Sequence, residues 1–309
     1  MLKYEPLLPL PSGVSLDFSG PALIMAIVNC NDDSFYAPSR ALMDKAVEKA
    51  LRAEEEGASI VDFGGESSRP GSLYICEEEE MARVIPVIQA FRKRSRLPVS
   101  VDTRKAAVAG AALDAGADIV NDISALYDDP LMPALCARRG AAVVLMHKKG
   151  VPLTMQEAPR YDDPVAEVGA FLKVAAERAI ASGVCAGKII VDPGIGFGKG
   201  LQDNLELLRG LPRLAEMCGN DYPVLVGLSR KSMVGAITGR DAGERLWGTL
   251  AANAAAIMGG AAVIRLHDVK EHLDLVKMLS ALNIGRPYIG RPYIERPSDG
   301  ITAWNGFSA

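Results

Sequence analysis

The chain has 309 residues, a formal net charge of −4 and 49% apolar residues. This length allows one large domain or two ordinary ones, and the apolar fraction predicts a packed core. Because the net charge provides no overall attraction to nucleic acid or to an anionic membrane, we expect small-molecule partners, no nucleic acid and no membrane.

Residues 1–21 are predicted to form an extension ahead of the first strand. Their opening, MLKYEPLLPLPSG, is interrupted by prolines and lacks the basic-then-apolar order of a signal peptide. No apolar run in the sequence approaches the roughly 20 residues that a membrane-spanning helix needs. We therefore expect a soluble protein that is not exported.

Eight short apolar runs, rich in β-branched residues, predict strands along the chain. They cover residues 23–29, 59–65, 99–102, 118–122, 142–147, 189–192, 224–229 and 263–267. Each run is apolar at nearly every position, which is typical of a parallel sheet that is covered on both faces.

Between these runs lie stretches with helical periodicity, several of them ended by glycine. They cover residues 44–57, 77–94, 105–116, 164–183, 201–217 and 244–260. This alternation predicts an α/β fold, a single-domain (β/α)8 TIM barrel over residues 22–284. A doubly wound open sheet is the competing fold, but no GxGxxG follows the first strand and no change of composition marks a second domain.

The last segment, residues 285–309, is predicted to be a tail on the surface of the barrel. It repeats RPYI at 286–289 and 291–294, and its prolines exclude a helix. A surface extension fits this composition better than a recognition motif.

Five cysteines are spread along the chain: Cys30, Cys76, Cys136, Cys185 and Cys218. Their odd number and wide spacing argue against a disulfide framework, and the lack of a CxxC pair or of neighbouring histidines argues against a zinc site. A reducing compartment fits this pattern, so we expect a cytoplasmic location.

Polar side chains stand at the carboxyl ends of all eight predicted strands, where a TIM barrel builds its active site. In chain order these ends carry Asn29, residues 64–71, Asp102, Asn121 with Asp122, His147, Asp192, Ser229 with Arg230 and Lys231, and Arg265 with His267. Each residue alone could be a helix cap, a turn residue or a structural histidine. Eight polar ends that converge on one barrel mouth instead predict a binding site.

The residue types indicate what this site binds. Asp102, Asn121 and Asp192 offer acceptors for the amino-substituted ring-nitrogen edge of a flat heterocycle. The amino end of a helix that begins near Asp268 would favour an anion. Donors suited to phosphate come from four basic residues: Arg69, Lys231, Arg265 and His267. The mouth is therefore predicted to bind a heteroaromatic phosphoester.

Seven segments resemble the signature segments of the dihydropteroate synthase family, in the same order and at similar spacing. They are VDFGGESSRPG, SVDTRKA, AGADIVNDIS, VVLMHKKGVPLTMQ, IIVDPGIGFGKG, VLVGLSRKS and IRLHDV. The resemblance implies a pterin-binding barrel of folate biosynthesis, a sulfonamide target that condenses 6-hydroxymethyl-7,8-dihydropterin diphosphate with para-aminobenzoate. The products would be 7,8-dihydropteroate and diphosphate, with Mg²⁺ as cofactor and a homodimer as the assembly.

The resemblance assigns five residues to the pterin: Asp102, Asn121, Met146, Asp192 and Lys231. Three of them, Asp102, Asp192 and Lys231, are expected to be catalytic. If the bond to the diphosphate breaks before the amine attacks, positive charge spreads into the pterin ring. The two aspartates would then stabilise that charge.

The departing diphosphate would bind to Asn29, Arg265 and His267, with Asn29 also a ligand of Mg²⁺. The arylamine of para-aminobenzoate is a sufficient nucleophile against a cation, so the reaction requires no nucleophile from the protein. Para-aminobenzoate would bind to a further set of residues: Ser68, Arg69, Pro70, Phe197 and Ser229.

The loop after the first strand departs from the family pattern. Where the family typically has Thr-Pro the chain has Asn31-Asp32, and where it has Asp-Gly-Gly the chain has Ala37-Pro38-Ser39. The altered loop keeps open a second hypothesis, a pterin-binding paralogue without synthase activity. A methyltetrahydrofolate-type methyltransferase is a third, but the SRKS and RLHDV segments count against it because methyl transfer has no diphosphate to bind.

Overall fold

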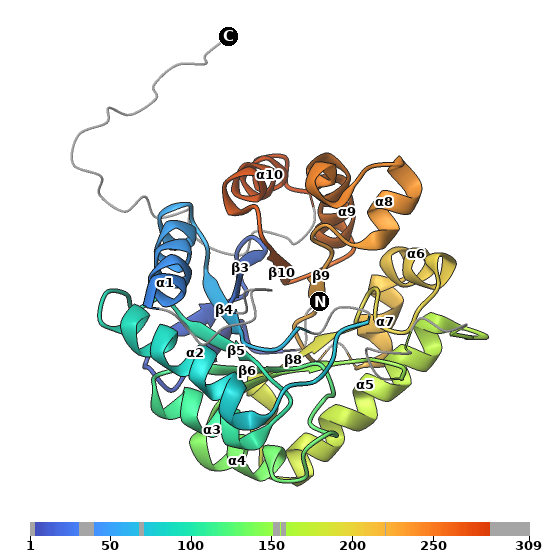
Figure 1. Ribbon diagram of the computed structural model, residues 1–309. Coiled ribbons are helices and arrows are strands. Elements are labelled where there is room, and N and C mark those ends of the chain that lie inside the picture. Colours follow the sequence, from blue (N-terminus) through green and yellow to red (C-terminus); the bar gives the residue numbers. More distant parts are fainter. Residues whose placement is uncertain are drawn as a thin grey trace.

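The computed structural model describes residues 4–30, 40–67, 71–150, 155, 159–219 and 221–284. Within these residues, eight parallel strands form the wall of a barrel and helices surround it (Figure 1). The strands of the wall are β3 (Leu23–Asn29), β4 (Ile60–Gly64), β5 (Val99–Asp102), β6 (Ile119–Asp122), β7 (Ala142–Met146), β8 (Ile189–Asp192), β9 (Leu225–Gly227) and β10 (Val263–Leu266).

The outer helices provide the crossovers that successive parallel strands require. They are α1 (Arg40–Glu55), α2 (Glu77–Arg92), α3 (Ala106–Asp114), α4 (Met132–Arg139), α5 (Pro164–Ala181), α6 (Leu201–Arg209), α7 (Leu211–Met217), α8 (Ser232–Thr238), α9 (Leu246–Met258) and α10 (Val269–Ala281). Short 3₁₀ turns at Ala186–Lys188 and Ala242–Glu244 precede β8 and α9. The helix predicted to begin near Asp268 is therefore α10.

Neighbouring strands pair in the order β8-β7-β6-β5-β4-β3-β10-β9. The two end strands of this order meet at an isolated parallel bridge between Val191 and Val224, which closes the sheet. All eight predicted strands are confirmed, some of them one to three residues shorter than expected. The closure decides against the doubly wound alternative, because an open sheet leaves its two edge strands unpaired.

The helical stretch predicted over residues 201–217 forms two helices, α6 and α7, instead of one. Gly210 lies between them, and Pro212 occupies the first turn of α7. Proline has no backbone N–H to continue the hydrogen bonding of α6, so a new helix begins at this point.

Residues 1–21, predicted as an extension, contain a β-hairpin that covers the amino-terminal end of the barrel. Its strands, β1 (Leu7–Pro9) and β2 (Ser15–Asp17), pair antiparallel. The hairpin packs against the first residues of the barrel strands, among them Met25, Ile60 and Ile119. Four of its side chains are at most 5% exposed and form what we call the amino-terminal plug: Leu8, Leu10, Leu16 and Phe18.

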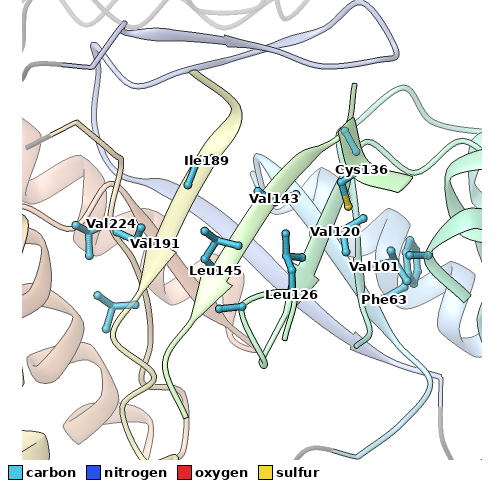
Figure 2. Close-up of a cluster of buried hydrophobic side chains, with 14 of the residues drawn as sticks. Phe63, Val101, Val120, Leu126, Cys136, Val143, Leu145, Ile189, Val191 and Val224 are labelled. Carbon is cyan, nitrogen blue, oxygen red and sulfur yellow. The ribbon is translucent and has the colours of Figure 1, made fainter. Parts of the chain in front are cut away.

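Side chains along each strand point alternately to the outer helices and to the barrel interior. The outward-facing residues form the main core with the helices, and Figure 2 shows Val101, Val120 and Leu145 within it. Phe63 of β4 meets Phe91 of α2 edge to face, with 5.6 Å between the ring centroids. The inward-facing residues are left to form the site.

Candidate active site at the carboxyl end of the barrel

The same alternation arranges the barrel interior in layers. Inward residues near the starts of the strands are apolar, and Ile60, Ile119 and Ile190 lie in the cluster that contains the amino-terminal plug. Two positions further along, the same face carries a polar layer: Asp62, Asn121, Asp192 and Arg265. The candidate site therefore lies directly above an apolar floor.

Arg265 of β10 joins two carboxylates across the interior. Its Nε donates to Oδ2 of Asp62 at 2.6 Å, and its Nη2 donates to Oδ2 of Asp102, also at 2.6 Å. Oδ2 of Asp62 accepts a further bond from Nδ2 of Asn121 at 3.2 Å. Arg265, predicted at the diphosphate, is thus held by a carboxylate that was predicted to face the pterin.

Asp62 is a site residue that the sequence reasoning missed. It is fully buried in β4 and contacts both Arg265 and Asn121. The signal that could have found it is a carboxylate in the middle of the otherwise apolar strand IVDFG. Since a buried carboxylate is costly without a partner, such a residue predicts a cation nearby.

Burial controls the protonation of these groups. It raises the pKa of the Asp102 carboxyl to about 7, although Arg265 opposes the shift. Burial also disfavours the charged form of Arg265, but Asp62 and Asp102 outweigh it and raise the pKa of the guanidinium. The interior therefore holds a permanent cation beside a carboxyl group that ionises near neutral pH.

Lys231, Asp192 and Phe197 lie on one side of the mouth. Lys231 Nζ donates to the backbone oxygen of Ile195 and lies 4.7 Å from the centroid of the Phe197 ring. Oδ1 of Asp192 accepts from the backbone N–H of Gly194 at 2.7 Å. Burial lowers the pKa of Lys231 to about 8 and raises that of Asp192, while the attraction between the two charges opposes both shifts.

Ser229 and His267 form a hydrogen-bonded pair, although they were assigned to different substrates. The backbone N–H of His267 donates to Ser229 Oγ at 3.2 Å, and Ser229 Oγ lies 2.9 Å from Nδ1 of the His267 ring. Burial, followed by the charges of Lys49 and Arg265, lowers the pKa of His267 to about 4. The ring is therefore neutral, and with the hydroxyl donating to Nδ1, Nε2 carries the proton.

Of the other predicted site residues, the structure describes Asn29 and Met146 but not those of the two loops. Asn29 is exposed at the end of β3, and Met146 is 4% exposed at the end of β7, paired in register with Asp192. The predicted aminobenzoate residues Ser68, Arg69 and Pro70 lie outside the described residues, as does the altered loop at 31–39.

Two of the polar strand ends serve the fold. Asp122 caps the turn after β6, where its Oδ1 accepts from the backbone N–H of Ser124 at 2.7 Å and its Oδ2 from that of Leu126 at 3.1 Å. His147 is 7% exposed and contacts the buried Lys199, at 2.9 Å between Nδ1 and Nζ. These contacts favour a capping role for Asp122 and a structural role for His147.

Comparison with known proteins connects this geometry to a family. The family model described as "pterin binding enzyme" matches residues 25–267. The chain is 44% identical over 271 residues to the dihydropteroate synthase of Escherichia coli, a match that covers 87% of this chain and 94% of that protein.

Two solved structures extend the similarity to three dimensions. The dihydropteroate synthase of Yersinia pestis in a sulfonamide drug complex has a TM-score of 0.82 and 40% identity, covering 88% of this chain and 97% of that one. The dihydropteroate synthase of Xanthomonas albilineans with 4-aminobenzoic acid has a TM-score of 0.82 and 42% identity, covering 90% and 98%. The similarity therefore spans the whole barrel.

Proposed function

The chain belongs to the dihydropteroate synthase family of transferases, and we propose that the polar layer at its barrel mouth carries out the family's reaction. This reaction condenses 6-hydroxymethyl-7,8-dihydropterin diphosphate with para-aminobenzoate to give 7,8-dihydropteroate and diphosphate. The observation that carries the proposal is the charge pattern above the apolar floor. The buried carboxyl group of Asp192 and the partly buried one of Asp102 lie there with two partly buried cations, Lys231 and Arg265.

The pterin ring binds against this layer, with its amino-substituted edge at the acceptors of Asp102, Asn121 and Asp192 and one face on Met146. When the bond from the pterin methylene to the diphosphate breaks, positive charge spreads into the ring. The carboxylates are buried, so their attraction for that charge is screened less than it would be in water. Lys231 hydrogen-bonds the ring, and its charge favours the ionised form of Asp192.

The departing diphosphate takes its donors from Arg265 and His267. A guanidinium has five N–H donors, so the bonds from Arg265 to Asp62 and Asp102 leave others for phosphate oxygens. The neutral His267 ring supplies its Nε2–H, oriented by the bond between Nδ1 and Ser229. Negative charge on the leaving group is thus met by a different set of residues from the pterin cation.

The donor set fits a Mg²⁺ ion that arrives with the diphosphate. Mg²⁺ at phosphate sites usually keeps several waters and takes one or two protein ligands beside the phosphate oxygens. Asn29, exposed at the end of β3, offers one such ligand through its carboxamide oxygen. When bound, the ion would neutralise charge on the diphosphate and make it a better leaving group.

Para-aminobenzoate binds beside the Phe197 ring and Lys231, together with Ser229 and the loop residues Ser68, Arg69 and Pro70. After the diphosphate has left with the bonding electron pair, the amine attacks the cationic pterin methylene, supplies the electron pair of the new C–N bond and loses one proton. A sulfonamide has the same aryl amine, and we propose that it competes for this pocket, as the drug complex of the Yersinia pestis relative suggests.

A homodimer is proposed through α9, which carries an apolar stripe on its outer face. Trp247 is 78% exposed and Met258 is 59% exposed, with the exposed Ala251 and Ala255 between them at helical spacing. Small residues between two large ones allow another helix to approach closely. Trp247→Glu should convert the dimer to a monomer in sedimentation velocity, and a monomeric wild type would contradict the proposal.

A cytoplasmic location is proposed from the cysteine pattern. All five cysteines are free thiols, as a reducing compartment would keep them. Among the residues that the structure describes, no helix combines the length and the apolar character needed to cross a membrane.

The deciding experiment is direct. Purified protein is mixed with the dihydropterin diphosphate, para-aminobenzoate and Mg²⁺, and dihydropteroate is followed by chromatography. Product should form with wild type and be nearly absent with Asp192→Asn. Binding of the pterin without any product would instead support the paralogue without synthase activity, the hypothesis that the altered loop at 31–39 keeps open.

A further inference from the structure

Lys199 is a buried lysine that none of the steps above uses. It is 2% exposed and lies in the β8–α6 loop, residues 193–200. Its Nζ donates to the backbone oxygens of Gly194 at 2.9 Å, Phe197 at 3.1 Å and His147 at 3.2 Å. A fourth acceptor, Nδ1 of the His147 ring, lies 2.9 Å from Nζ, so the three N–H donors are shared among four acceptors.

These contacts enclose the ammonium group completely in protein acceptors. Burial lowers the pKa of Lys199 to about 7 and that of His147 to about 3, so the ring is neutral and accepts at Nδ1. Burying a charged amine costs free energy unless every donor is satisfied. Lys199 therefore acts through the groups that it holds, because its amine has no open path to a substrate.

The acceptors belong to two segments that are distant in sequence. Gly194 and Phe197 lie within the loop, whereas His147 directly follows β7. The approach is close: a Cβ on Gly194 would lie 1.9 Å from the backbone oxygen of His147, and Gly194 has a φ of +64°. Lys199 therefore links the loop to the end of β7 at the point where the backbones of Gly194 and His147 are in close contact.

The same loop contacts two residues proposed to bind the pterin, Asp192 and Lys231, and carries Phe197, which is proposed to bind para-aminobenzoate. Gly194 N–H holds Asp192, the oxygen of Ile195 accepts from Lys231, and the Phe197 ring lies beside the Lys231 amine. We propose that Lys199 is a positioning residue that locks the β8–α6 loop onto the end of β7 and thereby sets the pocket for the aryl amine substrate. This inference rests on the proposed function in assigning that substrate to Phe197.

The first test removes the donors while keeping the length of the side chain. Lys199→Met should raise the KM for para-aminobenzoate about tenfold or more, because the loop itself carries Phe197 and small misplacements of a binding group are costly. The KM for the dihydropterin diphosphate should rise less than about threefold, because Asp102 and Asn121 also hold the pterin and lie on other strands. Lys199→Gln, which keeps two N–H donors, should recover part of the loss. The matched control is Lys277→Met on the exposed face of α10, which should change neither KM.

An unchanged KM for para-aminobenzoate in Lys199→Met would overturn the proposal. Equal increases of both KM values together with a lower melting temperature would also overturn it, since Lys199 would then only stabilise the fold.

A second measurement does not depend on catalysis. The loop amides of Gly194, Gly196 and Phe197 are hydrogen-bonded at 2.7, 2.7 and 3.0 Å. Hydrogen exchange of peptides covering residues 193–200 should be about tenfold faster in Lys199→Met than in wild type or Lys277→Met. If wild type makes no dihydropteroate but this difference appears, the proposed function fails while the positioning role stands. Unchanged exchange contradicts the positioning role itself.

Discussion

The two ends of the barrel differ in the polarity of the side chains that fill them. At the amino-terminal end, the plug of Leu8, Leu10, Leu16 and Phe18 covers the floor with side chains that are at most 5% exposed. At the carboxyl end, the barrel interior instead holds four ionisable groups: Asp62, Asp102, Asp192 and Arg265.

This difference separates stability from function. Apolar contacts at the plug stabilise the fold by removing surface from water, at no electrostatic cost. Buried charges at the mouth oppose folding unless they are paired, and their shifted pKa values reflect that cost. Substitutions at the plug should therefore reduce stability, whereas substitutions at the mouth should reduce turnover.

The largest expected effect is at the mouth. Asp192→Asn should lower kcat by about 10² to 10³-fold, because the carboxylate that stabilises the pterin cation is lost. The free energy of unfolding should stay the same or rise, since a buried charge is removed. Steady-state kinetics and urea denaturation measure the two quantities. Asp114→Asn, at a side chain that is 61% exposed, is the control. A loss of stability without a loss of turnover would reverse the proposed roles of the two ends.

At the plug the effect should fall on stability. Phe18 is 1% exposed, so Phe18→Ala should lower the free energy of unfolding by about 3 to 5 kcal/mol through the cavity that it leaves. Below the melting temperature, kcat should remain that of wild type. Leu7 lies in the same hairpin but is 54% exposed, and Leu7→Ala should change stability by less than about 0.5 kcal/mol. An inactive but stably folded Phe18→Ala would show that the plug also shapes the site.

Within the mouth, His267 and Arg265 should differ. His267→Ala should weaken binding of the diphosphate ester by about 1.5 to 3 kcal/mol and leave a non-phosphorylated pterin unaffected, since one bond to a charged phosphate is lost. Arg265→Ala should weaken the binding of both ligands, because Arg265 also hydrogen-bonds Asp62 and Asp102. Isothermal titration calorimetry of each variant with the diphosphate ester and with the non-phosphorylated pterin measures these affinities. Equal losses for both ligands in His267→Ala would place the ring at the pterin.

The pH should change activity and stability in opposite directions. Below about pH 7, Asp102 becomes protonated, so kcat/KM should fall about tenfold per pH unit. Folding raises this pKa from 3.8 to about 7, so the contribution to stability is fully present below 3.8 and is lost as the pH rises through 7. Between pH 5 and about 7, the protein should therefore gain activity while it loses stability.

An alkaline limb completes the pH profile. Above about pH 8, Lys231 loses its proton, and kcat/KM should fall again. Lys231→Arg, which stays charged, should abolish this limb even if it lowers the maximum. A profile that is flat from pH 6 to about 9 would show that neither Asp102 nor Lys231 titrates in the catalytic step.

The sequence alone determined the barrel and most of the candidate site. Apolar runs, helical periodicity and the polar residue at each strand end are local patterns, and a parallel barrel brings every such end to one mouth. Asp102, Asn121, Asp192 and Lys231 could therefore be selected before any contact was known. The residues of the altered loop and of the Ser68 loop could be selected in the same way, but they lie outside the described residues.

The tertiary structure decided which residues hold the site together. Asp62 meets Arg265 across 203 positions of sequence, and Lys199 meets His147 across 52. A carboxylate within an apolar strand predicts that a cation lies near it, but the sequence does not say which cation, because only chain folding brings the partner near. The plug could not be predicted for the same reason. Residues 1–21 have the composition of an extension, and the apolar floor that they cover is assembled from strands that are far apart in the sequence.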